Sequence, residues 1–134
     1  MNVLVIDGQG GQLGSQLIRA LRNRREGLTI FAVGTNATAS AAMMKAGADT
    51  AAAGENPVLV ACRKADVIIG PIGIVIADAL LGEVTPAMAV AVGQSPARKL
   101  LLPVNQCNNI VAGVPNLSLG KLMDEAVELL KSML

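Results

Sequence analysis

The first eighteen residues constrain the fold of this chain more than any other stretch. An apolar run from Val3 to Ile6 ends at a cluster of glycines, and an amphipathic helical pattern starts at Gln12. A strand, a glycine turn and a helix in direct succession open a dinucleotide-binding fold. Gly8, Gly11 and Gly14 are spaced G-x-x-G-x-x-G, which suits a tight turn, close approach of a pyrophosphate and close packing of helix on strand.

The start of this first helix is predicted to bind phosphate. Unpaired N–H groups and the positive end of the helix dipole favour an anion there, and a branched side chain at Gly11 is expected to obstruct it. The alternative is a purely structural turn. The predicted cofactor-binding residues of the turn are Gly8, Gln9, Gly10, Gly11, Gln12 and Leu13.

Apolar strand patterns and helical patterns alternate along the whole chain. Of its 134 residues 52% are apolar and Phe31 is the single aromatic residue, which favours helices packed closely on both faces of a parallel sheet. We predict one α/β domain over residues 1–134, a Rossmann-like three-layer fold with a mostly parallel sheet of about five strands in the order 3-2-1-4-5. Strands are expected at 3–6, 28–33, 49–52, 67–69 and 100–104, and helices at 12–25, 37–45, from 56, 74–81, from 86, and 119–134.

Composition excludes some classes of partner. Eleven basic and ten acidic side chains nearly cancel, and aromatic platforms are lacking, so we expect no nucleic-acid binding. The chain carries two cysteines and starts without a basic, apolar leader, so we expect a cytoplasmic protein with free thiols.

The stretch 72–92 is apolar enough to resemble a membrane span. Asp78, Glu83 and the Thr85-Pro86 break argue against one, and the stretch divides better into two short apolar helices. A helix that is apolar on all sides must be buried. We therefore predict that part of this surface forms a homodimer interface. Burial entirely within the monomer is the open alternative.

Ligands of open α/β sheets bind beyond the carboxyl ends of the strands, where the strand order reverses. Further predicted cofactor-binding residues at that edge are Gly34, Thr35, Asn36, Gly70, Pro71, Ile72 and Asn105. An NAD site has an Asp or Glu after the second strand, whereas this chain has Thr35 and Asn36. The expected ligand is therefore NADP or another nucleotide. Any dinucleotide preference is expected to favour NADP over NAD, or neither strongly, because no arginine stands beside these residues to clamp a 2′-phosphate.

Candidates for chemistry are few. Cys107 follows the fifth strand and Asp78 flanks the apolar stretch, but the chain has no histidine to activate a nucleophile. Cys62 fits a core position. Asp7, directly before the glycine turn, opposes an anion unless it binds backbone N–H groups or a sugar hydroxyl. Scattered carboxylates and distant cysteines predict no metal site.

Four arginines lie on the exposed face and last turn of the first predicted helix. They are Arg19, Arg22, Arg24 and Arg25. A solvated helix face whose charges complement the helix dipole is favoured over an anion site.

The turn from Gly8 to Gly14 resembles that of extended and atypical short-chain dehydrogenases, including dTDP-sugar reductases. Those enzymes use a Tyr-x-x-x-Lys pair, and this chain contains no tyrosine, so that chemistry does not carry over.

Nearly the whole chain resembles a family of short bacterial proteins known as domain of unknown function 3842. The resemblance implies a bacterial, cytoplasmic, Rossmann-like protein and no defined activity. It rests on the stretches 5–11, 32–36, 64–78 and 103–105.

Three hypotheses follow from the sequence. The first is a nucleotide-binding sensor or regulatory module that holds NADP or another nucleotide. The second is a small oligomeric enzyme whose site is shared between subunits, with Cys107, Asp78 or Lys99 as reactive groups. The third is a Rossmann-like scaffold without a ligand.

Overall fold

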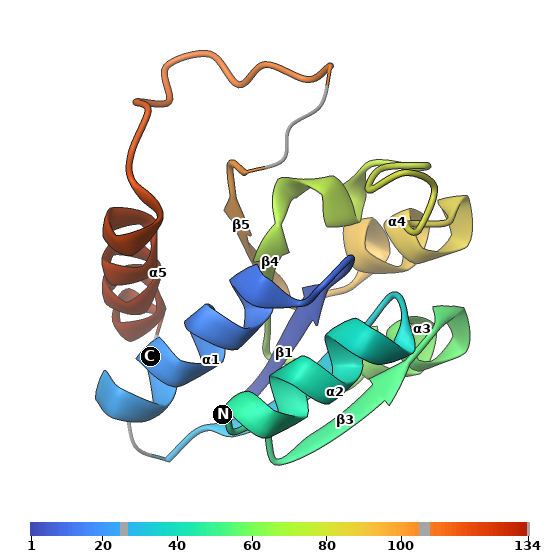
Figure 1. Ribbon diagram of the computed structural model, residues 1–134, viewed down its shortest axis with the longest axis horizontal. Helices are drawn as coiled ribbons and strands as arrows, with labels where there is room; N and C mark the ends of the chain where they lie inside the picture. The colour runs from blue at the N-terminus through green and yellow to red at the C-terminus, as the bar shows by residue number, and fades with distance from the viewer. Residues whose placement is uncertain (25–26, 105–107, 134) are drawn as a thin grey trace.

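A five-stranded parallel sheet forms the centre of the computed structural model, which describes residues 1–24, 27–104 and 108–133 (Figure 1). The strand order is β3-β2-β1-β4-β5, and each neighbouring pair is parallel. This confirms the predicted fold class and strand order. The strands are β1 (Asn2–Asp7), β2 (Thr29–Gly34), β3 (Thr50–Ala53), β4 (Val67–Pro71) and β5 (Arg98–Leu102).

Helices cover both faces of the sheet (Figure 1). Val3 and Val5 of β1 lie in one apolar core, and Leu4 and Ile6 lie in the other. A strand buried on both faces has no polar side, which explains the continuous apolar runs in the sequence. One face carries α1 (Gln12–Arg24), α2 (Ala37–Ala46) and α5 (Leu119–Ser132); the other carries α3 (Glu55–Cys62), the 3-10 helix η1 (Ile72–Val75) and α4 (Pro86–Gln94).

The carboxyl ends of β1 and β2 lie side by side. Asp7, the last residue of β1, pairs in register with Gly34, the last residue of β2. The chain leaves β1 through the glycine turn into α1, and it leaves β2 through Thr35 and Asn36 into α2. Two predicted binding loops are therefore neighbours at the carboxyl edge of the sheet, and the loop after β1 borders the point between β1 and β4 where the strand order reverses.

The predicted helix at 74–81 is wrong. Only the short η1 forms, and a loop of hydrogen-bonded turns follows it over residues 76–85, hereafter the Glu83 loop. Asp78, Leu80 and Leu81 have φ values of 66°, 56° and 58°, which a right-handed helix does not tolerate. The prediction of all-round burial also fails within the chain, because Leu81 is 94% exposed.

β4 is longer than predicted and includes Gly70 and Pro71, which the sequence placed in a loop. A Cβ atom added to Gly70 would overlap the backbone oxygen of Ile6 in β1. Gly70 therefore serves the close approach of two central strands. β5 ends at Leu102, earlier than expected, because its pairing with β4 runs from Arg98 to that residue.

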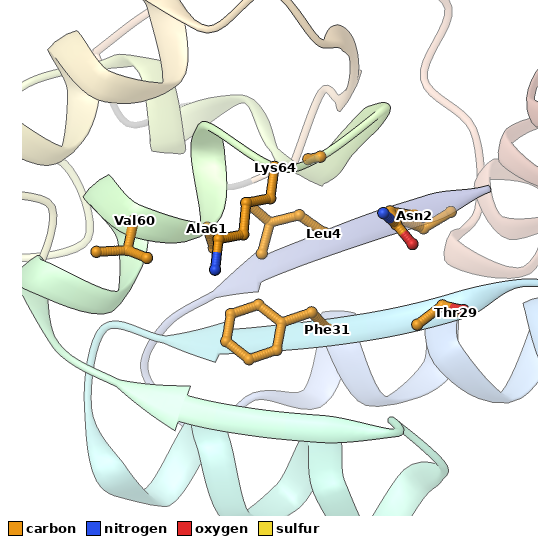
Figure 2. A pocket seen from close by; sticks show the side chains of 9 residues that line it. Asn2, Leu4, Thr29, Phe31, Val60, Ala61 and Lys64 are labelled. Carbon is orange, nitrogen blue, oxygen red and sulfur yellow. The ribbon is translucent and has the colours of Figure 1, made fainter.

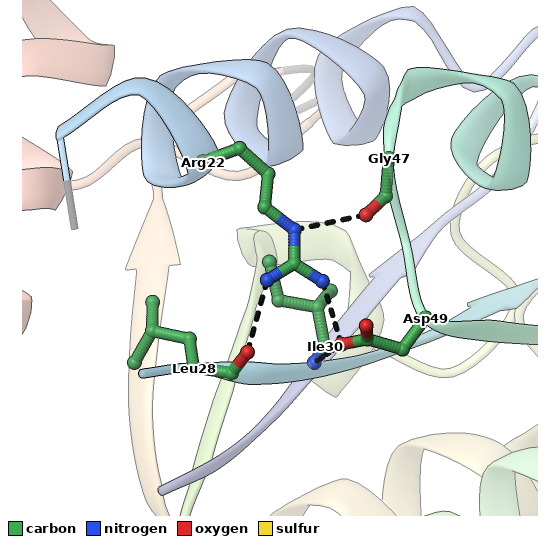
Figure 3. Close-up of polar contacts among 5 residues, drawn as sticks. All are labelled: Arg22, Leu28, Ile30, Gly47 and Asp49. Carbon is green, nitrogen blue, oxygen red and sulfur yellow. Dashed lines mark hydrogen bonds and ion pairs between the residues drawn. The ribbon is translucent and has the colours of Figure 1, made fainter. Parts of the chain in front are cut away.

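Arg22 corrects the prediction of a solvated arginine face (Figure 3). Its Nε donates to the backbone oxygen of Gly47 at 2.9 Å, and its Nη1 donates to that of Leu28 at 2.9 Å. Its Nη2 pairs with Asp49 Oδ2 at 2.6 Å, and the same oxygen accepts from the Ile30 N–H at 2.7 Å. These bonds hold the pKa of Asp49 below its usual value, the Ile30 bond first and then Arg22. Arg22 thus fastens α1 to the ends of three other elements.

The other predicted arginines give a mixed result. Arg19 is exposed, as expected. The side chain of Arg24 and the whole of Arg25 lie outside the described residues.

Over the part of the chain that is described, none of the helices has the length and apolar character needed to cross a membrane.

Candidate functional site

Asp7 fixes the shape of the glycine turn. The residue is 5% exposed, its Oδ1 accepts from the Gly8 N–H at 2.8 Å, and its Oδ2 accepts from the Gly14 N–H at 2.7 Å. Of the two alternatives for this carboxylate, the structure shows bonding to backbone N–H groups. Burial raises the pKa of Asp7, the two hydrogen bonds oppose that shift, and the charge of Glu83 adds to it.

Three N–H groups of the turn have no acceptor within the described residues, namely those of Gly10, Gln12 and Leu13. The Gly11 N–H instead donates to the Gly8 oxygen at 2.9 Å, which closes the turn. Gly10 and Gln12 are exposed. Unpaired N–H groups at the start of a helix can bind an anion.

The glycines of the turn serve different purposes. Gly11 has a φ of 73°, and a Cβ atom there would lie 2.8 Å from the backbone of Ala39 in α2. A Cβ on Gly14 would lie 2.5 Å from the Met43 sulfur. A Cβ on Gly10 would meet nothing within 4 Å. A side chain at Gly11 would therefore clash with α2, and the obstruction of a phosphate at this position stays a prediction.

Glu83 is the functional candidate that the sequence did not reveal. Its Oε1 accepts three hydrogen bonds, from the Gln9 N–H at 2.8 Å, Thr35 Oγ1 at 2.7 Å and Asn36 Nδ2 at 2.7 Å. Partial burial works to raise the pKa of Glu83, but these three bonds outweigh it and hold the pKa below its usual value. The carboxylate is therefore ionised near neutral pH. Its one local sequence signal is Gly82, a helix breaker directly before it.

Thr35 and Asn36 therefore lie beside the glycine turn, as the strand order predicted. The contact runs through the Glu83 carboxylate, which accepts hydrogen bonds from both residues and from Gln9. Asn36 Nδ2 also donates to the Gln9 oxygen at 3.0 Å, and its Oδ1 accepts from the Ala39 N–H at 2.8 Å, which caps α2. Gly34 is buried at the end of β2. The premise of the NADP prediction, that no carboxylate stands beside Thr35 and Asn36, does not hold in three dimensions.

The remaining predicted cofactor-binding residues do not join this cluster through any hydrogen bond among the described residues. Gly70 and Pro71 belong to β4, and Ile72 opens η1. Asn105 lies outside the described residues, as does the predicted nucleophile Cys107.

The other candidates for chemistry are separate from one another. Asp78 is exposed in the Glu83 loop, and Lys99 Nζ donates to the backbone oxygen of Ser95. Cys62 is buried in the core, as predicted, and burial raises the pKa of its thiol to about 11, so it is a poor nucleophile. Across the described residues no group of three or more potential metal ligands occurs.

A separate hollow lies at the other end of the strands (Figure 2). Asn2 and Thr29, the first residues of β1 and β2, are at its rim, and its walls are mainly apolar, including Phe31 and Val60. The glycine turn and Glu83 meet instead beside the carboxyl ends of β1 and β2.

Comparison with known proteins identifies a family. A solved structure of a dodecameric FMN-dependent Ubix-like decarboxylase from Escherichia coli is similar at 18% sequence identity and a TM-score of 0.46, over 99% of this chain and 76% of that chain. No curated protein matches the chain. The model of the family described as Domain of unknown function (DUF3842) matches residues 2–134, and the chain therefore belongs to that family.

Proposed function

We propose that the chain is a nucleotide-binding module whose ligand places its phosphates on the glycine turn. The observation that carries the proposal is the set of three unpaired N–H groups, those of Gly10, Gln12 and Leu13. Asp7 fixes the turn from its buried side, so these groups are arranged before any ligand arrives.

The carboxylate of Glu83 limits where such phosphates can lie. A hydrogen bond to a charged group contributes about 1.5–3 kcal/mol, and Glu83 Oε1 accepts three of them. Displacing it is therefore costly. The proposal places the phosphates beside Glu83, at the start of α1, where the helix dipole offsets the repulsion from the carboxylate.

Gly10→Val is the sharpest test of this site. The substitution puts a branched side chain at the one glycine of the 8–14 turn whose Cβ would have open space and whose N–H is unpaired. We expect the variant to stay folded and to bind nucleotide at least tenfold more weakly, measured by calorimetry with NAD, NADP, ATP and FMN. A ligand at 100 times its dissociation constant should stabilise the wild type by about 2.7 kcal/mol.

Gly93→Val is the matched control, because Gly93 also has open space around its Cβ position but lies in α4. It should bind as the wild type does. If a folded Gly10→Val protein keeps full affinity for a nucleotide that the wild type binds, the phosphates lie elsewhere.

A ligand-free scaffold is the second candidate. It is favoured by the hydrogen bond that the Gln9 N–H donates to Glu83, because this N–H group of the turn then needs no anion from outside the protein. Failure of every tested nucleotide to bind at millimolar concentration would support this reading. The enzyme with a site shared between subunits remains a hypothesis that rests on Cys107, Asp78 or Lys99 as reactive groups.

The assembly state is a further prediction. Val90 on α4 is 52% exposed and Met88 is 4% exposed, so a charge at Val90 tests the proposed homodimer, whereas a charge at Met88 would disrupt the core. We expect Val90→Glu to be monomeric and Val90→Thr to remain a dimer by light scattering at micromolar concentration. A monomeric wild type would contradict the dimer.

A bacterial origin, a cytoplasmic location and a single domain over 1–134 also stay predictions.

A further inference from the structure

We propose that Glu83 recognises the ribose of the bound nucleotide and selects a free 2′-hydroxyl over a 2′-phosphate. The inference rests on the proposed function and assigns its specificity. It reverses the NADP preference expected from the sequence.

The two carboxylate oxygens of Glu83 differ in their surroundings. Oε1 accepts from Gln9, Thr35 and Asn36, whereas no hydrogen-bond donor among the described residues reaches Oε2. One oxygen thus fixes the position of the group and the other is available to a ligand. Since a carboxylate only accepts hydrogen bonds, its partner must be a donor such as a ribose hydroxyl.

The place of this carboxylate in the fold fits that partner. Dinucleotide-binding folds hold the ribose 2′-hydroxyl with an acidic side chain near the end of the second strand, next to the glycine turn. Glu83 bonds to Thr35 and Asn36, directly after β2, and to Gln9 in the turn. In this protein the acidic residue comes from the loop between η1 and α4. Its carboxylate nevertheless lies between the glycine turn and the residues that follow β2.

Packing and backbone hydrogen bonds in the Glu83 loop fix the position of the Glu83 carboxylate. Leu80 and Val84 on either side are 3% and 1% exposed, and they belong to the apolar core beneath α4. Backbone bonds from Glu83 to Leu80 and from Val84 to Ala79 close the turns around it. Thr85 then caps α4 and donates to Glu55 Oε1 at 2.6 Å.

The negative charge of Glu83 favours a ribose 2′-hydroxyl over a 2′-phosphate. Asp7 and Glu83 interact electrostatically across the turn, and Glu83 is ionised because its hydrogen bonds favour the charged form. A 2′-phosphate brings a charge of about −1.5 to −2 next to this carboxylate, and like charges repel. A 2′-hydroxyl donates to it instead.

The test compares NAD with NADP, which differ only in the 2′-phosphate. We expect the wild type to bind NAD at least tenfold more tightly by calorimetry. Glu83→Gln keeps an oxygen for the three protein donors but replaces the free carboxylate oxygen with an amide that donates. Its affinity for NAD should fall about tenfold or more and its affinity for NADP should stay or rise. The variant should stay folded, although its neutral acceptor weakens the three hydrogen bonds and lowers its thermal stability. Glu128→Gln, a charge change on an exposed residue of α5, should alter neither affinity.

The outcomes separate the two proposals. If NAD and NADP bind equally, or if Glu83→Gln leaves their ratio unchanged while Gly10→Val still weakens both, the ribose assignment is overturned and the phosphate site stands. If neither dinucleotide nor any mononucleotide binds the wild type, both proposals fall.

Discussion

Gly11→Ala is expected to lower the free energy of unfolding by about 2–5 kcal/mol, with no ligand present. The left-handed backbone of Gly11, with its φ of 73°, costs another residue about 1–2 kcal/mol. The added Cβ also lies 2.8 Å from two backbone atoms of Ala39, and overpacking of this kind costs about 1–3 kcal/mol. Since those atoms belong to α2, α1 and α2 have to separate to admit the methyl group.

The measurement is urea unfolding of the apo protein, with Gly10→Ala as its neighbour control. Gly10 has open space at its Cβ position and no positive φ, so its alanine variant should unfold within about 0.5 kcal/mol of the wild type. Equal stability of the two variants would show that the contact between Gly11 and α2 is absent in solution.

Gly70→Ala is expected to destabilise the fold by roughly 1–3 kcal/mol, because the added methyl group forces apart two strands of the sheet. The new Cβ would overlap the Ile6 backbone oxygen and crowd the Ile74 side chain at 3.1 Å. Ile6 lies in β1 and Gly70 in β4, two central strands, and neither can move without disturbing its other neighbour.

Gly93→Ala is the control for this second prediction. Gly93 lies in α4 with nothing within 4 Å of its Cβ position, so alanine should stabilise the protein by about 0.5–1 kcal/mol. A Gly70→Ala protein as stable as the wild type would argue that this glycine serves a ligand, as the sequence suggested, and not the approach of β4 to β1.

Much of the architecture follows from local patterns. The apolar run at 3–6 and the helical pattern from Gln12 predicted β1, the glycine turn and α1. Thr85 and Ser118 cap α4 and α5 as their sequence positions indicate. The strand order follows from the alternation of strands and helices, because right-handed crossovers leave few topologies open.

Local patterns failed where the backbone conformation depends on distant partners. The apolar residues at 74–81 read as a helix, but burial of Leu80 and Val84 in the core favours turns with left-handed residues. An arginine on an exposed helix face reads as solvated, yet Arg22 meets Asp49 at a separation of 27 residues.

The candidate site divides in the same way. The sequence by itself determined the glycine turn, the position of Thr35 and Asn36 beside it, and the absence of an acid at the end of β2. The tertiary structure decided that Glu83, 74 residues from Gln9 and 48 from Thr35, supplies a carboxylate to both. Periodicity and spacing report on residues that are neighbours along one strand or helix. Which side chain closes a contact between distant segments depends on the path of the connecting loop, and that path is set by packing of the whole core.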